Sequence, residues 1–396
     1  MGIRPEREMK TGKQGDVKYL KDQTLWQRRQ AKWTKYIEFA ALRFMAWTRW
    51  LDESVEDTYA NSRNSALGFE ENEETGAWRV WLQELPPLDV LMVWHSFMLN
   101  PRMLSEECSN SIIHKLRMPW KLVHESINNR DWVFTQSSTA SRLFERKVGL
   151  PADLLDTFTD WATFVSSTNL VSGYSLVDHG GEFQNLLPLK DLGNVKGRLA
   201  KYNLLFNCPK EGLATSLRDA VIRQAEFVDK MNNHLWIRSP ALEGTIERAI
   251  LRYREFLCLL KYNKGKTVVP TLEIDLVWHT HQCLSLGYVK ATKAIVGRFI
   301  NHDDTIVQEA LGDGFALTKK LYRLRFGRDY RACGCWDCEM LLDELRVLRA
   351  PGPGRVVDMT ELARRAGDKV SYYRAVEVAL RKKTPLPVPN SGPTPR

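Results

Sequence analysis

The chain contains the same apolar segment twice. Residues 86–95 read PPLDVLMVWH, and residues 270–279 read PTLEIDLVWH. When Trp94 is aligned with Trp278, 184 positions later, the Pro, Leu, Val, Trp and His positions coincide, and the acidic and β-branched positions match in kind. A repeat of this kind indicates a duplicated unit in which each half supplies one copy of a shared structural element.

Each copy follows a long stretch with helical periodicity, at residues 25–51 and 242–262. Apolar side chains recur there at spacings of three and four, which predicts one buried stripe per helix. Similar patterns predict helices over 105–116, 150–164, 215–234, 305–326, 339–348 and 359–383. Residues 53–76 are predicted to form a loop, and the best strand signal is short, at residues 266–269. We therefore expect a mainly α fold, built from two diverged repeats of a long helix plus a Trp-His helix, with few or no strands.

Composition predicts the domain boundaries. Polar or Pro/Gly/Ser-rich stretches mark the segments that do not build a packed core. The expected parts are a disordered basic tail (1–22), a first helical half (23–165), a hinge (166–193), a second helical half with a cysteine cluster (194–350), and a Pro/Gly linker followed by a basic helix and a disordered tail (351–396).

Charge and apolar content restrict the partners. The net charge is +9, with 12 basic and 5 acidic residues in 1–50 and 17 basic and 9 acidic residues in 319–396. Basic ends can contact nucleic acid, but they are also ordinary solvated helix faces, and no RNA-recognition or Cys2His2 zinc-finger pattern occurs. No apolar run of about 18 residues predicts a membrane span, and no secretory signal is expected at the N-terminus. Seven scattered cysteines favour a reducing cytoplasmic or nuclear setting.

The second Trp-His segment carries polar residues that the first lacks. Asp275 lies one helical turn before His279, so its carboxylate can support a metal-bound imidazole, whereas the first copy has Leu91 there. His281 lies about 200° around the helix from His279, so the two would not share one ion on a regular helix. The alternative is a buried, hydrogen-bonded histidine beside a tryptophan, and we favour that interpretation for His95.

A second candidate follows at residues 302–304. His302 and Asp304 have the H-x-D spacing that non-haem iron sites use for two ligands. His302 is the last histidine of the chain, so His279 or His281 would have to complete the site through the fold. The alternative is that Asp303 or Asp304 caps the next helix.

The most specific cluster is Cys333-x-Cys335-x-x-Cys338. Three thiolates can supply three ligands to zinc, which we favour over iron, and a thiolate-rich site of this kind is structural rather than catalytic. Inert thiols and a redox-active Cys335–Cys338 pair are the alternatives. The candidates for a fourth ligand are Cys283, His281 and His302.

These motifs resemble those of the glycine-rich domain-containing protein family, in particular its fungal branch. The resemblance rests on residues 270–282, 88–101, 301–304 and 333–338, and covers roughly residues 30–345. This chain lacks the glycine-rich tail of the family, and Phe97 stands where the family usually has a second histidine. The resemblance implies no established reaction.

The functional prediction is an intracellular helical interaction or regulatory protein with an unidentified protein partner and a metal site in its second half. No G-x-S-x-G, G-x-x-x-x-G-K-[ST], G-x-G-x-x-G or H-E-x-x-H motif occurs, so no catalytic residue and no organic cofactor are assigned. One alternative is a metal-dependent enzyme, non-haem iron included, that acts on a small molecule in fungal specialised metabolism. A nucleic-acid-binding protein that uses its basic termini is the other.

Overall fold

A computed structural model describes residues 9–11, 17–19, 25–58, 67–71, 78–155, 211–302, 304–305, 308–348 and 358–388. The chain divides into two compact units, one of residues 1–126 and 134–223, the other of residues 127–133 and 224–396. The boundary falls within helix α8 (Glu211–His234). The predicted hinge at 166–193 lies outside the described residues.

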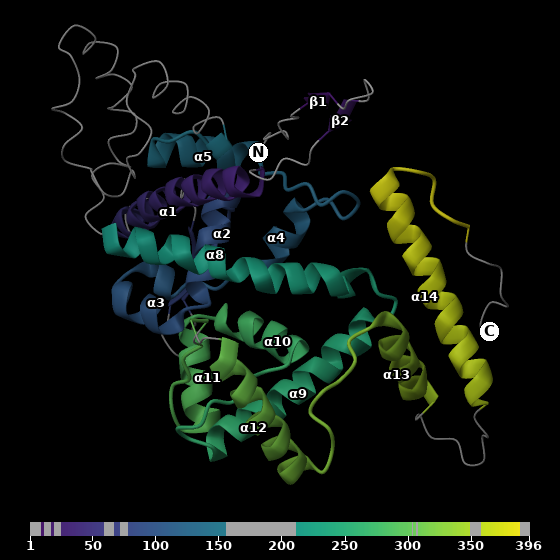
Figure 1. Ribbon diagram of the computed structural model, residues 1–396. Coiled ribbons are helices and arrows are strands. Elements are labelled where there is room, and N and C mark those ends of the chain that lie inside the picture. Colours follow the sequence, from purple (N-terminus) through teal and green to yellow (C-terminus); the bar gives the residue numbers. More distant parts are fainter. Residues whose placement is uncertain are drawn as a thin grey trace, which may run out of the picture. The chain divides into compact units, whose positions relative to one another are not determined.

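The first unit is built around a long helix, α1 (Leu25–Thr58), which packs on α2 (Leu88–Met98) (Figure 1). Between them in sequence, β3 (Leu67–Glu71) and β4 (Trp78–Leu82) form an antiparallel hairpin in which Leu67 lies opposite Leu82. A second small hairpin consists of β1 (Met9–Thr11) and β2 (Val17–Tyr19). The remaining described helices are α3 (Pro101–Glu107), η1 (Ile112–His114), α4 (Trp120–Ser126) and α5 (Ser138–Val148).

The core of this unit lies between α1 and α2, because both helices place aromatic residues on the shared face. Trp47 and Trp94 have ring centroids 5.6 Å apart. Beside them, the Arg43 guanidinium donates to Asp89 at 2.7 Å, and both side chains are buried. The ion pair therefore neutralises two charges that the core would otherwise expel.

The second unit begins within α8 and continues through a series of helices. They are η4 (Trp236–Arg238), α9 (Leu242–Tyr262), α10 (Leu272–Gln282), α11 (Leu286–Val296), α12 (Gln308–Phe326), α13 (Trp336–Leu348) and α14 (Met359–Lys382). Helices α13 and α14 pack side by side (Figure 1).

Helix α10 contacts two apolar cores of the second unit. Ile274 and Trp278 belong to a core formed with α9, α11 and α12. Leu272 and Leu276 pack against another core, centred on Trp336 of α13. Contact with both cores fixes the rotation of α10 and so the direction in which its polar side chains point.

The mainly helical class is confirmed, and α9 has the bounds that periodicity predicted. Three local predictions are wrong. The predicted helix at 105–116 is interrupted, because α3 ends at Glu107 and only the short 3-10 helix η1 follows at Ile112–His114. The predicted loop at 53–76 includes the end of α1 and strand β3, and residues 266–269 form no strand. Instead, the Val269 N–H donates to Thr318 Oγ1 and its carbonyl accepts from the Tyr330 hydroxyl, so side chains take the place of a strand partner.

Among the helices of the described part of the chain, none combines the length and apolar character needed to cross a bilayer.

Candidate metal centre

Three side chains of the second unit direct ligand atoms at a common point. Asp275 Oδ1 lies 3.4 Å from His279 Nε2 and 3.5 Å from His302 Nε2, and the two Nε2 atoms are 3.3 Å apart. We refer to Asp275, His279 and His302 as the Asp-His-His centre. Together they form one of the groups in the described residues whose atoms are close enough to hold an ion.

The dimensions of this triangle match tetrahedral coordination. Zinc–nitrogen and zinc–oxygen bonds of about 2.0–2.1 Å at tetrahedral angles separate neighbouring ligand atoms by about 3.3–3.4 Å. An octahedral ion with similar bond lengths would bring neighbouring ligand atoms to about 3.0 Å. The observed edges of 3.3–3.5 Å fit the tetrahedral ion, with three protein ligands and one further position.

Helix α10 supplies two of the three ligands because Asp275 and His279 are four residues apart and share a face. The start of the helix is held by Glu273, which accepts from Thr271 Oγ1 at 2.6 Å and from Arg252 Nε at 2.8 Å. His279 packs against Phe227, with ring centroids 4.3 Å apart. This ring contact restricts the orientation of the imidazole.

The third ligand comes from the segment after α11. The Tyr288 hydroxyl accepts from Trp278 Nε1 at 2.9 Å and donates to the Ile300 carbonyl at 2.8 Å, which ties this segment to α10. Arg298 adds a hydrogen bond of 2.6 Å to the Leu260 carbonyl. His302 then packs edge-on against Trp278, with centroids 5.0 Å apart, so its position is fixed by the fold before any ion binds.

The centre is enclosed but not sealed. The side chains of His279 and His302 are 5% and 11% exposed, and that of Asp275 is 21% exposed. Burial alone would raise the pKa of Asp275, but His302, His279 and Lys230 outweigh it and lower the pKa. Within the described residues, Asp275 Oδ1 has no well-aligned hydrogen bond, so it is available as a ligand.

The other sequence-predicted ligands lie elsewhere. His281 points to the other side of α10, where its Nδ1 is 2.8 Å from the Tyr253 hydroxyl and burial lowers its pKa. Asp304 belongs to neither potential ligand group of the described residues. In the first unit, His95 lies edge-on to Trp120, and burial lowers its pKa to about 4. The structure gives Asp275, which the sequence suggested only as a supporting residue, the geometry of a direct ligand.

The cysteine cluster, Cys333, Cys335 and Cys338, forms a separate group. The three Sγ atoms all lie within 4.8 Å of one another, and the cluster can therefore hold a metal ion. Cys335 immediately precedes α13, and its carbonyl accepts from the Glu339 N–H at 3.0 Å. A hydrogen bond with the Cys335 backbone, followed by hydrogen bonds with the Cys335 and Cys338 side chains, lowers the pKa of Cys333. Hydrogen bonds with the Cys335 and Cys333 side chains raise the pKa of Cys338 to about 12.

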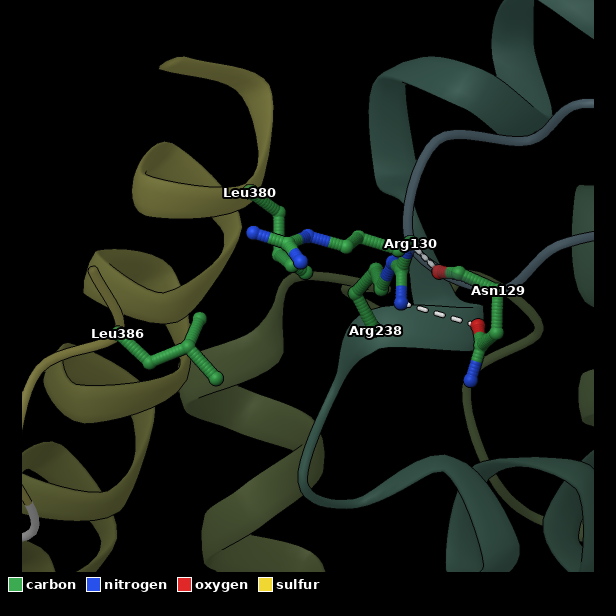
Figure 2. Close-up of a pocket in the computed structure, with 5 residues that line it drawn as sticks. All are labelled: Asn129, Arg130, Arg238, Leu380 and Leu386. Carbon is green, nitrogen blue, oxygen red and sulfur yellow. Dashed lines mark hydrogen bonds between the residues drawn. The ribbon is translucent and has the colours of Figure 1, made fainter. Parts of the chain in front are cut away.

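A surface pocket of about 370 Å³ in the second unit is distinct from both groups. Figure 2 shows it between Arg130, Arg238, Asn129, Leu380 and Leu386. The guanidinium of Arg238 already donates to Asn129, lies 3.2 Å from Glu377 and stacks over Trp132 at 4.2 Å. Its charge is therefore neutralised within the unit.

The basic side chains of α14 are also largely paired. Glu344 lies 3.1 Å from Arg365 and 2.5 Å from Lys369, and Asp337 lies 2.6 Å from Arg374. Further ion pairs along the helix involve Arg364 and Arg381. These pairs attach α14 to its own unit and leave little of its charge for a nucleic-acid backbone.

Comparison with known proteins places the matched region around α8 to α11. Residues 196–291 match the model of a family described as "Glycine-rich domain-containing protein-like". Over these residues the chain is similar to the glycine-rich domain-containing protein family. The matched region includes Asp275 and His279, whereas His302 and the cysteine cluster lie beyond it.

Two Arabidopsis thaliana proteins are similar to the chain. Glycine-rich domain-containing protein 2 is 35% identical over 100 residues, which cover 23% of this chain and 13% of the relative. Glycine-rich domain-containing protein 1 is 33% identical over 142 residues, which cover 34% of this chain and 16% of the relative. The chain thus matches only a small part of each relative. No solved structure matches it.

Proposed function

We propose that this chain is a zinc-dependent interaction protein whose second unit is organised by one ion at the Asp-His-His centre. The observation that carries the proposal is the triangle of ligand atoms with edges of 3.3–3.5 Å. Two imidazole Nε2 atoms facing each other at 3.3 Å cannot both keep a proton there, and a cation satisfies both lone pairs together with the carboxylate.

The identity of the ion follows from the donors. Two nitrogens and one carboxylate oxygen suit zinc, and the spacing fits its tetrahedral geometry. Calcium and magnesium prefer six or more oxygen ligands, so both are disfavoured. Iron(II) uses the same two-histidine, one-carboxylate set but needs more open, octahedral positions.

An ion here would join two parts of the unit that the chain connects only through α11. Asp275 and His279 lie on α10, and His302 lies in the segment before α12. The ion would make the surface of α10 and its neighbours rigid, which is the property that an interaction surface needs. A protein partner of unstated identity remains part of the proposal.

Zinc affinity tests this function directly. Competition with a chromophoric chelator should show that His302→Ala weakens zinc binding by more than about tenfold, the lower end of the loss seen even for supporting residues. His281→Phe is the matched control, because it removes a histidine from the same helix but not from the centre, and it should bind zinc like the wild type. Equal affinity in His302→Ala would contradict the proposal.

A metal-dependent enzyme is the second candidate, favoured by a centre with three protein ligands and by the partial exposure of Asp275. In this case the ion would hold a water or small-molecule substrate. Cobalt-loaded protein tests the second candidate: azide should alter the cobalt spectrum if the fourth position accepts small ligands, and an unchanged spectrum would contradict it. A role in fungal specialised metabolism and a cytoplasmic location stay predictions from the sequence.

A further inference from the structure

We infer that the cysteine cluster binds a second zinc ion with His234 as its fourth ligand. This Cys3His site lies apart from the Asp-His-His centre and does not depend on it. It is built where the end of α8 meets the start of α13. The contacts around residue 334 carry the inference.

The three thiols already have nearly the spacing of a zinc site. Zinc–sulfur bonds of about 2.3 Å at tetrahedral angles place neighbouring sulfur atoms about 3.8 Å apart. The Sγ atoms lie within 4.8 Å of one another. Side-chain rotations that shorten each Sγ–Sγ distance by about 1 Å or less would therefore close the site around an ion.

His234 lies beside the segment of residues 333–335. A Cβ atom built on Gly334, between Cys333 and Cys335, would lie 3.4 Å from His234 Cε1. Cε1 is bonded to both ring nitrogens, so an imidazole nitrogen lies next to the cysteine cluster. His234 is half-buried and stacks on Trp236 with centroids 5.0 Å apart, which holds the ring at this place. For His234 to complete the site, its side chain would have to turn from this stacked position so that a ring nitrogen faces the thiols.

Two reciprocal hydrogen bonds hold the backbone of the site. Trp236 Nε1 donates to the Gly334 carbonyl at 2.6 Å, and Trp336 Nε1 donates to the His234 carbonyl at 2.8 Å. Trp236 approaches so closely that its Cζ2 would lie 2.7 Å from a Cβ at residue 334, which explains the glycine. The fold therefore brings His234 and the segment of residues 333–335 together without the ion.

The residues that spacing suggested as a fourth ligand are buried or make contacts elsewhere. Cys283 is 1% exposed, so its thiol lies inside the core. His281 contacts Tyr253, and His302 belongs to the Asp-His-His centre. A closed Cys3His site has no open position, so the ion would lock the end of α8 to α13 rather than act on a substrate.

The test uses full-length protein carrying Asp275→Leu, so that only the cysteine site remains, and cobalt as the probe. Cobalt bound to thiolates gives an intense sulfur-to-metal charge-transfer band. We expect this band in the parent protein and in His124→Ala, an exposed-histidine control, with stoichiometry of one ion per chain. His234→Ala should weaken zinc binding, measured by displacement of cobalt, by more than about tenfold.

Two results would overturn the inference. One is the absence of the band in the parent protein with all three thiols reduced, shown by thiol titration. The other is zinc affinity in His234→Ala equal to that of His124→Ala. Circular dichroism of each variant checks that the fold is retained, and a conservative His234→Cys variant, which supplies a fourth thiolate, should restore tight binding if His234→Ala loses its local structure.

Discussion

Helices α2 and α10 each present a Trp-His pair to a long partner helix, and they use that frame differently. In the first unit, α1 contributes Arg43 to Asp89 and Trp47 to Trp94. In the second, α9 contributes Arg252 to Glu273 and Phe256 to Trp278. The spacing of four between the arginine and the aromatic residue is the same in α1 and α9.

A third matched contact shows where the two helix pairs diverge. Phe44 and Phe97 meet edge to face at 5.9 Å, and Tyr253 and His281 meet in the same way at 5.8 Å. An apolar pair thus corresponds to a hydrogen-bonded polar pair. Leu91 likewise corresponds to Asp275. The two helix pairs thus make contacts at equivalent positions, and the pair of α9 and α10 has polar residues where the pair of α1 and α2 has apolar ones.

The largest expected difference between the helix pairs α1–α2 and α9–α10 is the stability that each gains from its ion pair. Arg43 and Asp89 are 0% and 3% exposed, against 15% for both Arg252 and Glu273. Arg43→Ala leaves a buried carboxylate unpaired and should destabilise α1 by about 3–5 kcal/mol. Arg252→Ala should cost less, because water reaches Glu273. Hydrogen exchange of the α1 and α9 amides measures the loss of stability in each variant. Equal losses in Arg43→Ala and Arg252→Ala would contradict the difference in burial as its cause.

Metal removal should lower the stability of the helix pair α9–α10 but not that of α1–α2. A ligand present at about 100–1,000 times its dissociation constant stabilises the folded state by about 3–4 kcal/mol, so chelation should lower the opening free energy of α10 by this amount. Amides of α2 serve as the internal control and should not respond. Equal protection of α10 with and without chelator would argue against an ion at the centre.

Acidification should lower the stability of the helix pair α1–α2, because His95 on α2 is half-buried. Its folded pKa of about 4 lies below the ordinary value of 6.5, since burial opposes the charged form. The contribution of neutral His95 to the free energy of unfolding is therefore complete above pH 6.5 and is lost as the pH falls towards 4. It amounts to about 2 kcal/mol after allowance for the partial exposure of the side chain. His95→Gln, which cannot titrate, should flatten this part of the stability profile of α2. An unchanged profile would show that other groups cause it.

The smallest effect concerns Tyr253. Tyr253→Phe removes the hydroxyl that is 2.8 Å from His281 Nδ1 and should cost about 1 kcal/mol. Adding His281→Phe recreates the Phe44–Phe97 pair of the first unit, so the double variant should lose less than the sum of the two single losses. Denaturant unfolding of the four proteins gives the coupling energy. Additive losses would mean that the two contacts are not equivalent.

The sequence predicted the helices better than the site. The periodicity of residues 242–262 defined α9, because a long stripe admits one regular structure. The i, i+4 spacing of Asp275 and His279 also predicted that they share a face. Helical geometry alone separated His281 from His279, as the structure shows.

Contacts between distant segments were beyond sequence reasoning. The approach of His302 to α10 depends on the Trp278–Tyr288–Ile300 hydrogen bonds, which no local pattern reveals. The position of His234 beside the cysteine cluster depends on two tryptophan hydrogen bonds across the fold. One signal was available: Gly334 between two cysteines indicates a close approach by another group.

Elemental analysis tests the central claim most directly. The protein should be purified with Cys333, Cys335 and Cys338 replaced by serine, so that the Asp-His-His centre is the remaining group, and zinc per chain should then be measured with and without Asp275→Leu, the residue of the first copy. The account predicts one zinc per chain without the substitution and none with it. Absence of stoichiometric metal in the first protein, or its retention in the second, would contradict the account.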